Sequence, residues 1–148
     1  MSTASAAAGP SSIDRRTISL DGAQRVLRAA LAAADAHGVP VCVAVVDRSG
    51  NAVLTARMDD APLLSAGIAL DKAWTVASFN GLPTDRWWGA IEDDPALVHG
   101  ITKTPRLTIF GGGVPVLDGG GLVGAVGVSG GSAEQDTAIA TAAATSLV

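Results

Sequence analysis

Two charged residues near the middle of the chain have a spacing that suits acid–base chemistry. Arg57 and Asp59 are two positions apart at the end of a predicted strand, so their side chains share one face. A guanidinium binds a carboxylate in a bidentate manner, and Asp59 would act beside it as a base or an orienting group. Asp60 precedes a predicted helix, whose free N–H groups favour an anion. The alternative is a solvated ion pair followed by a helix cap.

Lys72 is the fourth charged candidate, and it falls within a predicted helix. Ile68, Thr75 and Phe79 lie on the same helical stripe, so the ammonium group emerges among mainly apolar neighbours. A partly desolvated lysine has a lowered pKa and is able to act as a base or an electrophile. The alternative is that its stem covers the core while the charge reaches water. Thr75 is included among the candidate ligand-binding residues.

Glycine-rich segments supply a second type of candidate site. Ser129 and Gly130 lie in a strand–turn–helix junction of small residues, and a helix N-terminus of this kind binds anions. The segment matches neither a P-loop nor a dinucleotide-binding loop, and a tight turn with an ordinary cap explains it equally well. Gly112 lies in a run of three glycines that would admit a ligand close to the backbone, or that forms a hairpin turn.

Aromatic residues are scarce, and two of them are adjacent. The chain has three tryptophans, two phenylalanines and no tyrosine. Trp87 and Trp88 would line an apolar pocket, anchor a subunit interface or pack in the core. No metal site is predicted, because the single cysteine belongs to no Cys/His cluster. The candidate haem-iron ligands are His99, Met58 and Cys42, and the spacing favours none of them.

The composition excludes several classes of protein. The 148 residues suit one domain, and 48% hydrophobic with 16% charged residues excludes a disordered chain. A net charge of −4 without a Lys/Arg run argues against nucleic acid as a partner. The apolar run at 41–46 is too short to span a membrane, and residues 1–12 do not resemble a signal peptide, so we expect a cytoplasmic protein. A surface with few charges predicts a homo-oligomer.

The residue pattern predicts alternating helices and hairpins after a flexible tail at residues 1–14. Helices are expected from Ser19 to Gly38, from about residue 60 to 80 and from Ser132 onward, with irregular or broken helix at 84–104. Strands are expected at 41–46, 51–58, 106–110, 114–117 and 122–128. Short connections favour an α+β fold in which a single antiparallel sheet of about five strands is flanked by helices, a profilin/roadblock-like layer architecture. Residues 15–148 would form this domain.

Five stretches in register resemble one family. They are 43–47 (VAVVD), 57–61 (RMDDA), 72–73 (KA), 111–115 (GGGVP) and 124–130 (GAVGVSG). The chain is similar in these stretches to the GlcG/HbpS-like, or haem-degrading domain, family, which includes the C-terminal domain of PduO-type cobalamin adenosyltransferases. The resemblance implies an antiparallel sheet, a dimer-based homo-oligomer such as an octamer, and haem as a candidate ligand without a required cofactor.

Two functional hypotheses follow. The first is a small-molecule-binding member of the family, for which haem is one candidate ligand. Asp60, Trp74 and the Trp87–Trp88 pair depart from the family pattern and would narrow a pocket, which favours a smaller ligand. The alternative is a cofactor-free lyase, isomerase or hydrolase that acts on a small anionic or cyclic substrate. Arg57 would then hold a negative oxygen while Asp59 or Lys72 moves a proton. A third class, a purely structural or regulatory oligomer, would bind no ligand.

Overall fold

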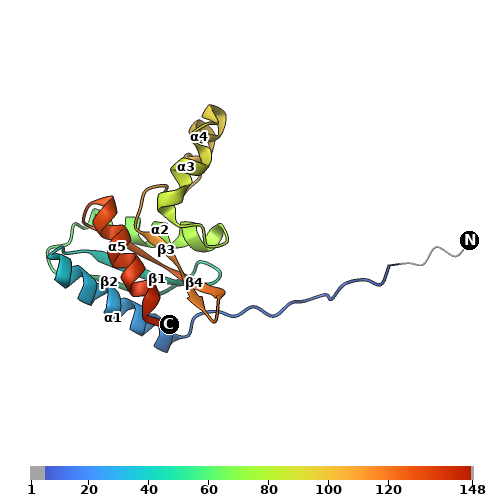
Figure 1. Ribbon diagram of the computed structural model, residues 1–148, viewed down its shortest axis with the longest axis horizontal. Helices are drawn as coiled ribbons and strands as arrows, with labels where there is room; N and C mark the ends of the chain where they lie inside the picture. The colour runs from blue at the N-terminus through green and yellow to red at the C-terminus, as the bar shows by residue number, and fades with distance from the viewer. Residues whose placement is uncertain (1–5, 148) are drawn as a thin grey trace, which may run out of the picture.

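A four-stranded antiparallel sheet with helices on both faces organises the chain (Figure 1). The computed structural model describes residues 6–147. The strand order is β2-β1-β4-β3, so the two predicted hairpins are joined through their inner strands. The elements in chain order are α1 (Leu20–His37), β1 (Cys42–Asp47), β2 (Ala52–Arg57), α2 (Leu64–Ser78), η1 (Thr84–Arg86), α3 (Trp87–Ile91), α4 (Pro95–Ile101), β3 (Gly113–Asp118), β4 (Gly121–Ser129), α5 (Ala133–Ala144) and η2 (Thr145–Leu147).

Helix α1 begins and ends where the sequence signals predict, and helix α5 begins where they predict. The Ser19 side chain accepts a hydrogen bond from the Gly22 N–H at the start of α1, and Gly38 ends the helix in the left-handed conformation. At the start of α5, Ser132 and Gln135 form a reciprocal capping box. These caps satisfy N–H groups that a helix leaves without intrahelical partners.

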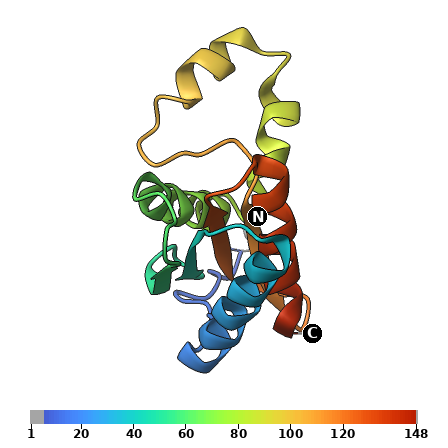
Figure 2. The same ribbon diagram turned by 90° about the vertical axis from the view of Figure 1, so that its left-hand side faces the viewer.

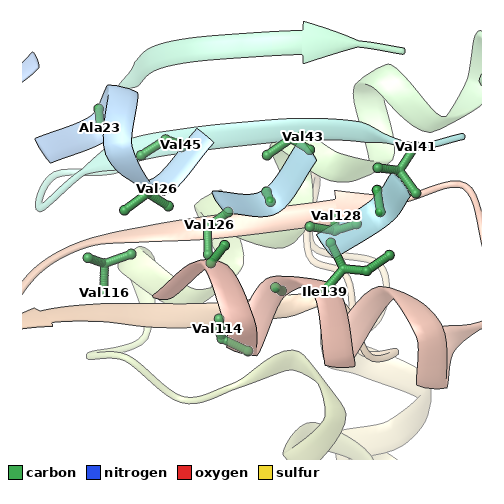
Figure 3. Packing of buried hydrophobic residues seen from close by; sticks show 14 of the residues in the cluster. Ala23, Val26, Val41, Val43, Val45, Val114, Val116, Val126, Val128 and Ile139 are labelled. Carbon is green, nitrogen blue, oxygen red and sulfur yellow. The ribbon is translucent and has the colours of Figure 1, made fainter. Parts of the chain in front are cut away.

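Side chains alternate between the two faces of the sheet, and nearly all residues of the inner strands β1 and β4 are buried. Val41, Val43 and Val45 pack with α1 and α5 in one hydrophobic cluster (Figure 3). Cys42 and Ala44 pack on the opposite face in a second cluster of small residues that includes Ala69 and Ala73 of α2. Figure 2 shows α1 and α5 on one side of the sheet and α2 on the other. Small side chains on the α2 face let that helix lie close to the strands.

The predicted strand at 106–110 is wrong. Arg106 has a left-handed backbone with φ 70°, which does not fit an extended strand. The Thr108 N–H donates to the Thr75 hydroxyl at 3.0 Å rather than to a neighbouring strand. The sheet therefore has four strands, close to the five expected, and the α+β fold with one antiparallel sheet is confirmed.

Residues 84–110 form an arm that projects from the sheet and its covering helices (Figures 1 and 2). It comprises η1, α3 and α4, followed by a segment that returns to the body. None of the α4 residues is buried. The broken-helix prediction for 84–104 is thus confirmed, and the arm brings Trp87 against α2.

Residues 6–17 at the other end of the chain are exposed and contain no helix or strand. The predicted tail began at residue 1, and residues 1–5 lie outside the part that the structure describes. Across residues 6–147, every helix falls short of the combined length and apolar character that a bilayer span needs.

Candidate functional site

Lys72 lies in α2 with its ammonium group enclosed by protein. Only 1% of the Lys72 surface is exposed to solvent. The Nζ atom donates to the Val128 carbonyl oxygen at 2.8 Å and to Asp136 Oδ2 at 3.1 Å. The Phe110 ring covers Nζ, with 5.0 Å to the ring centroid. Burial lowers the pKa of Lys72, and the Asp136 carboxylate partly offsets this effect. The ammonium group therefore has a partner on three sides, which differs from the snorkelling alternative.

Asp136 occupies the position at which the sequence predicted an anion site. Its Oδ1 atom accepts a hydrogen bond from the Gly131 N–H at 2.9 Å, and its side chain is as buried as that of Lys72. Ser129 is buried at the end of β4, and Gly130 follows with φ 144°. The junction before α5 therefore binds an internal carboxylate from the helix itself.

Gly112 lies directly against the Lys72–Asp136 pair. A Cβ atom at this position would lie 2.6 Å from Lys72 Nζ and 2.5 Å from the Val128 oxygen. Gly112 also has φ 128°, a conformation that favours glycine. The glycine run is therefore needed for close packing around the ammonium group, and the β3–β4 hairpin turn lies elsewhere, between residues 118 and 121.

Arg57, Asp59 and Asp60 lie apart from this pair. Arg57 is exposed at the end of β2 and pairs in register with Cys42. Burial raises the pKa of the Cys42 thiol, and the Arg57 charge partly offsets this rise. Asp59 and Asp60 line a different pocket of about 280 Å³, near the end of α1. Neither Arg57 nor Lys72 lines any of five well-formed pockets on residues 6–147.

Asp60 also differs from the expected helix-start residue. It has a left-handed φ of 66°, and α2 begins later, with Leu63 at the N-cap position. The side chain is therefore outside the first turn of α2 and does not benefit from its N–H groups. Asp59 and Asp60 line the pocket near the end of α1, and Arg57 does not. The three predicted residues therefore do not share one cavity.

Thr75 and Trp87, in contrast, meet at a pocket between α2 and the arm. The pocket has a volume of about 170 Å³ and an almost wholly apolar lining. We call it the Trp87 pocket. Its lining residues are Trp74, Thr75, Ser78, Phe79, Trp87, Ile101, Thr104 and Leu107.

Trp87 is the most deeply buried aromatic residue at this pocket. It is 3% exposed, and its ring packs on Phe79 with 4.8 Å between the centroids. Its Nε1–H finds no acceptor among residues 6–147. Buried polar groups nearly always have a partner, so this orphaned donor needs an explanation. Trp88, also predicted to bind ligand, is 52% exposed and does not line the pocket.

Arg106 fixes the returning segment of the arm at the rim of the Trp87 pocket. Its guanidinium donates to Asp71 Oδ1 at 3.0 Å and stacks 4.8 Å from the centroid of the Trp74 ring. Its carbonyl oxygen accepts from the Thr75 hydroxyl at 3.2 Å. A non-glycine residue with positive φ stores backbone strain, and such strain gathers at functional sites.

Several residues of both regions were not predicted from the sequence. Asp136 was not among the predicted site residues, although a carboxylate on the same helical stripe as Ile139 and Ala143 is a signal for a buried partner. No local pattern indicated Phe110 or Leu107, because the arm places them. Among residues 6–147, no group of three or more His, Cys, Asp or Glu side chains is arranged to hold a metal ion.

Known proteins resemble this chain in both sequence and fold. A 15.0 kDa protein from the dhaT–dhaS intergenic region of Citrobacter freundii is 42% identical over 129 residues, which cover 86% of this chain and 89% of that protein. The crystal structure of Klebsiella pneumoniae protein ORFY is similar with a TM-score of 0.88 and 38% identity, covering 95% of this chain and 97% of that one. The crystal structure of a PduOC–haem complex has a TM-score of 0.79 and 35% identity, covering 88% and 94%.

The family model for the haem-degrading protein HbpS-like family matches residues 18–145. This range contains the sheet, the five α-helices and the arm, as well as every residue of the Trp87 pocket. The chain therefore belongs to the HbpS-like family, which confirms the resemblance seen in its sequence motifs.

Proposed function

We propose that this chain is a small-molecule-binding protein whose ligand occupies the Trp87 pocket. The observation that carries the proposal is the pocket itself, a hollow of about 170 Å³ with an almost wholly apolar lining between α2 and the arm. Ligand sites commonly combine apolar walls with a few polar groups. The strained Arg106 at the rim supports the same placement.

Catalysis by Arg57, Asp59 and Lys72 has less support as an alternative. Lys72 Nζ already donates to Val128 and Asp136, and Phe110 covers it. A general base needs to lie within hydrogen-bond reach of the proton that it abstracts. A catalysed reaction that survives both Arg57→Ala and Lys72→Ala would eliminate this alternative.

Haem is the second candidate ligand, because the related PduOC chain was crystallised with haem. The Trp87 pocket of a single chain fits haem poorly, because its volume of about 170 Å³ is close to the size that holds one benzene ring. His99 is exposed on α4, while Met58 Sδ accepts from the Val41 N–H and Cys42 is buried. A haem site would therefore require surface from a second copy.

Absorbance spectroscopy tests the haem candidate. If haem binds through an axial protein ligand, titration into the purified protein will shift the Soret band, and His99→Ala will abolish the shift if α4 supplies that ligand. An unchanged Soret band at saturating protein would exclude haem as the ligand and favour a smaller molecule.

A homo-oligomer is part of the same proposal. The arm has no buried residue in α4, and large apolar side chains are exposed on several elements: Leu63, Leu64, Trp88, Leu97 and Phe110. A second copy would cover such surface. Native mass spectrometry will give a mass above 14.7 kDa for the assembled protein, whereas a monomer at micromolar concentration would contradict this part.

Benzene is a suitable probe for the Trp87 pocket because it matches the volume and carries no hydrogen-bonding group. We expect benzene to shift the indole N–H resonances of Trp74 and Trp87 in ¹⁵N-labelled protein and to leave that of exposed Trp88 in place. Leu107→Trp should fill the pocket and abolish the shifts. If benzene moves none of the three indole resonances, the pocket does not bind small molecules.

A further inference from the structure

We propose that the Phe110 side chain is a gate over Lys72, and that its opening gives water and small acylating molecules access to a buried amine. This inference does not depend on the ligand proposed for the Trp87 pocket, because Lys72 does not line that pocket. The closed gate keeps the Lys72–Asp136 ion pair dry, and the open gate makes Lys72 a site of covalent modification.

The Phe110 ring contacts a buried charge although much of the residue faces solvent. The Lys72 Nζ atom lies over the ring, 5.0 Å from its centroid. Phe110 is 51% exposed, whereas Lys72 is 1% exposed. The ring is therefore a thin cover at the protein surface, with the ammonium group directly beneath it.

The other contacts of the ammonium group come from regular elements or from close-packed backbone. Nζ donates to the Val128 carbonyl oxygen in β4 and to Asp136 Oδ2 in α5. At Gly112, the backbone lies so close that a Cβ atom would be 2.6 Å from Nζ. Core strands and helices open only with large parts of the fold, whereas one loop side chain moves alone. Phe110 is therefore the part of the enclosure that opens at the lowest cost.

The segment that carries Phe110 is held on both sides but not at Phe110 itself. Before it, the Thr108 N–H donates to the Thr75 hydroxyl at 3.0 Å. After it, the Gly112 carbonyl oxygen accepts from the Val128 N–H at 2.8 Å. Phe110 forms no backbone–backbone hydrogen bond with any residue of the described part of the chain. Exposed residues with few hydrogen bonds open locally without unfolding the domain.

Opening of the gate would expose an amine that is more reactive than an ordinary surface lysine. Burial lowers the pKa of Lys72, and the Asp136 carboxylate partly offsets this effect, so more of the amine is neutral at a given pH. The neutral amine attacks the carbonyl carbon of an acid anhydride. An N–C bond forms, the anhydride C–O bond breaks, a carboxylate leaves and the amine proton passes to water. The resulting amide leaves Asp136 without its counter-charge.

Acetic anhydride tests the gate, because the only two lysines of the chain are Lys72 and Lys103. Lys103 is exposed in the arm and is the internal reference. Cys42 is buried, so its alkylation by iodoacetamide reports unfolding. We expect Phe110→Ala to accelerate Lys72 acetylation about tenfold, since opening no longer breaks the cation–π contact. Peptide mass spectrometry should show unchanged rates at Lys103 and Cys42.

Trp88→Ala is the matched control for Phe110→Ala. Trp88 is similarly exposed, at 52%, and it makes no cation–π contact among residues 6–147. It should leave the Lys72 rate at the wild-type value. All rates are compared at one protein concentration, since a second copy seated on Phe110 would slow its opening. An unchanged Lys72 rate in folded Phe110→Ala, or parallel acceleration at Lys72 and Cys42, would overturn the proposal.

Urea gives a second measurement that needs no variant. Local opening exposes little surface, so wild-type Lys72 acetylation should be nearly independent of urea below the unfolding transition. Cys42 alkylation should accelerate with urea, because it requires unfolding. Equal urea dependence of the two rates would show that Lys72 is reached only through unfolding and would overturn the gate.

Discussion

Lys72 and Trp87 are both buried polar residues beside α2, and the chain surrounds their polar atoms differently. Lys72 Nζ has a carbonyl oxygen, a carboxylate and an aromatic ring as partners. Trp87 Nε1 has no partner among the described residues. Lys72 of α2 donates to Val128 of β4 and Asp136 of α5, whereas Trp87 of the arm packs on Phe79 at the end of α2.

The difference fits a structural role for Lys72 and the proposed ligand-binding role for the pocket at Trp87. A buried charge with all its partners inside the protein has little left to offer a ligand, and removing it destabilises the fold. A buried donor without a partner carries a desolvation cost that no hydrogen bond offsets. The most conspicuous charged residue of the sequence is therefore the weaker ligand-binding candidate.

The largest expected effect is the loss of stability when Lys72 is replaced. Lys72→Met leaves the buried Asp136 carboxylate without its counter-charge, so we expect the free energy of unfolding to fall by about 3–5 kcal/mol. Chemical denaturation followed by circular dichroism measures this change.

A double variant controls for the loss of side-chain volume. Lys72→Met combined with Asp136→Asn removes both charges and keeps an acceptor for the Gly131 N–H. It should recover most of the lost stability. A double variant as unstable as the single one would mean that the ion pair is not the cause.

The second effect concerns the glycine that lies against the pair. Gly112→Ala places a Cβ atom 2.6 Å from Lys72 Nζ and 2.5 Å from the Val128 oxygen, in a backbone conformation unfavourable for alanine. We expect it to lower the free energy of unfolding by about 2–3 kcal/mol. Gly120→Ala is the control, because Gly120 also has positive φ but nothing within 4 Å; about 1 kcal/mol is expected there. Equal losses would assign the effect to φ alone.

A smaller effect is the dependence of stability on pH. Burial lowers the pKa of Lys72 in the folded chain below its ordinary value. Between these two values the unfolded chain holds a proton that the folded chain has lost, so raising the pH stabilises the folded state. Below the folded value both states hold the proton, and Lys72 adds no slope. Relative to Lys72→Met, the wild type should therefore gain stability as the pH rises toward the ordinary lysine pKa. A relative loss over this range would contradict the direction of the shift.

The smallest effect is expected at Trp87, where the comparison predicts little change in stability. Trp87→Phe removes a donor that has no acceptor among residues 6–147, so the free energy of unfolding should fall only by the packing lost with the smaller buried ring, about 1–2 kcal/mol. Exposed Trp88→Phe should change it by less than about 0.5 kcal/mol. A loss above about 4 kcal/mol in Trp87→Phe would exceed this packing cost and contradict the prediction.

The fold was largely predictable because its signals are local. The caps at Ser19 and Ser132, the stop at Gly38 and the two hairpins each depend on a few neighbouring residues. The exception is 106–110, where apolar residues typical of a strand follow Arg106. Its strained backbone and the long-range bonds from Thr75 and Asp71 prevent pairing, and no local pattern encodes these contacts.

The candidate site was only partly predictable because it depends on the arm. The helical spacing correctly placed Thr75 on the stripe of Lys72, and the scarcity of aromatic residues drew attention to Trp87. The sequence did not separate Trp87 from Trp88, although one is buried and the other is half exposed. The sequence also did not show that Arg57 and Lys72 lie in different parts of the molecule. Strand alternation and helical periodicity predict which side chains share a face, but they do not predict the distance between two elements.

The most direct test of the central claim is a crystal structure of the protein soaked with benzene. The account predicts the benzene ring in the Trp87 pocket, in contact with Phe79 and Leu107. Benzene bound instead beside Lys72, or a Trp87 pocket that stays empty in protein shown to bind benzene in solution, would contradict the account.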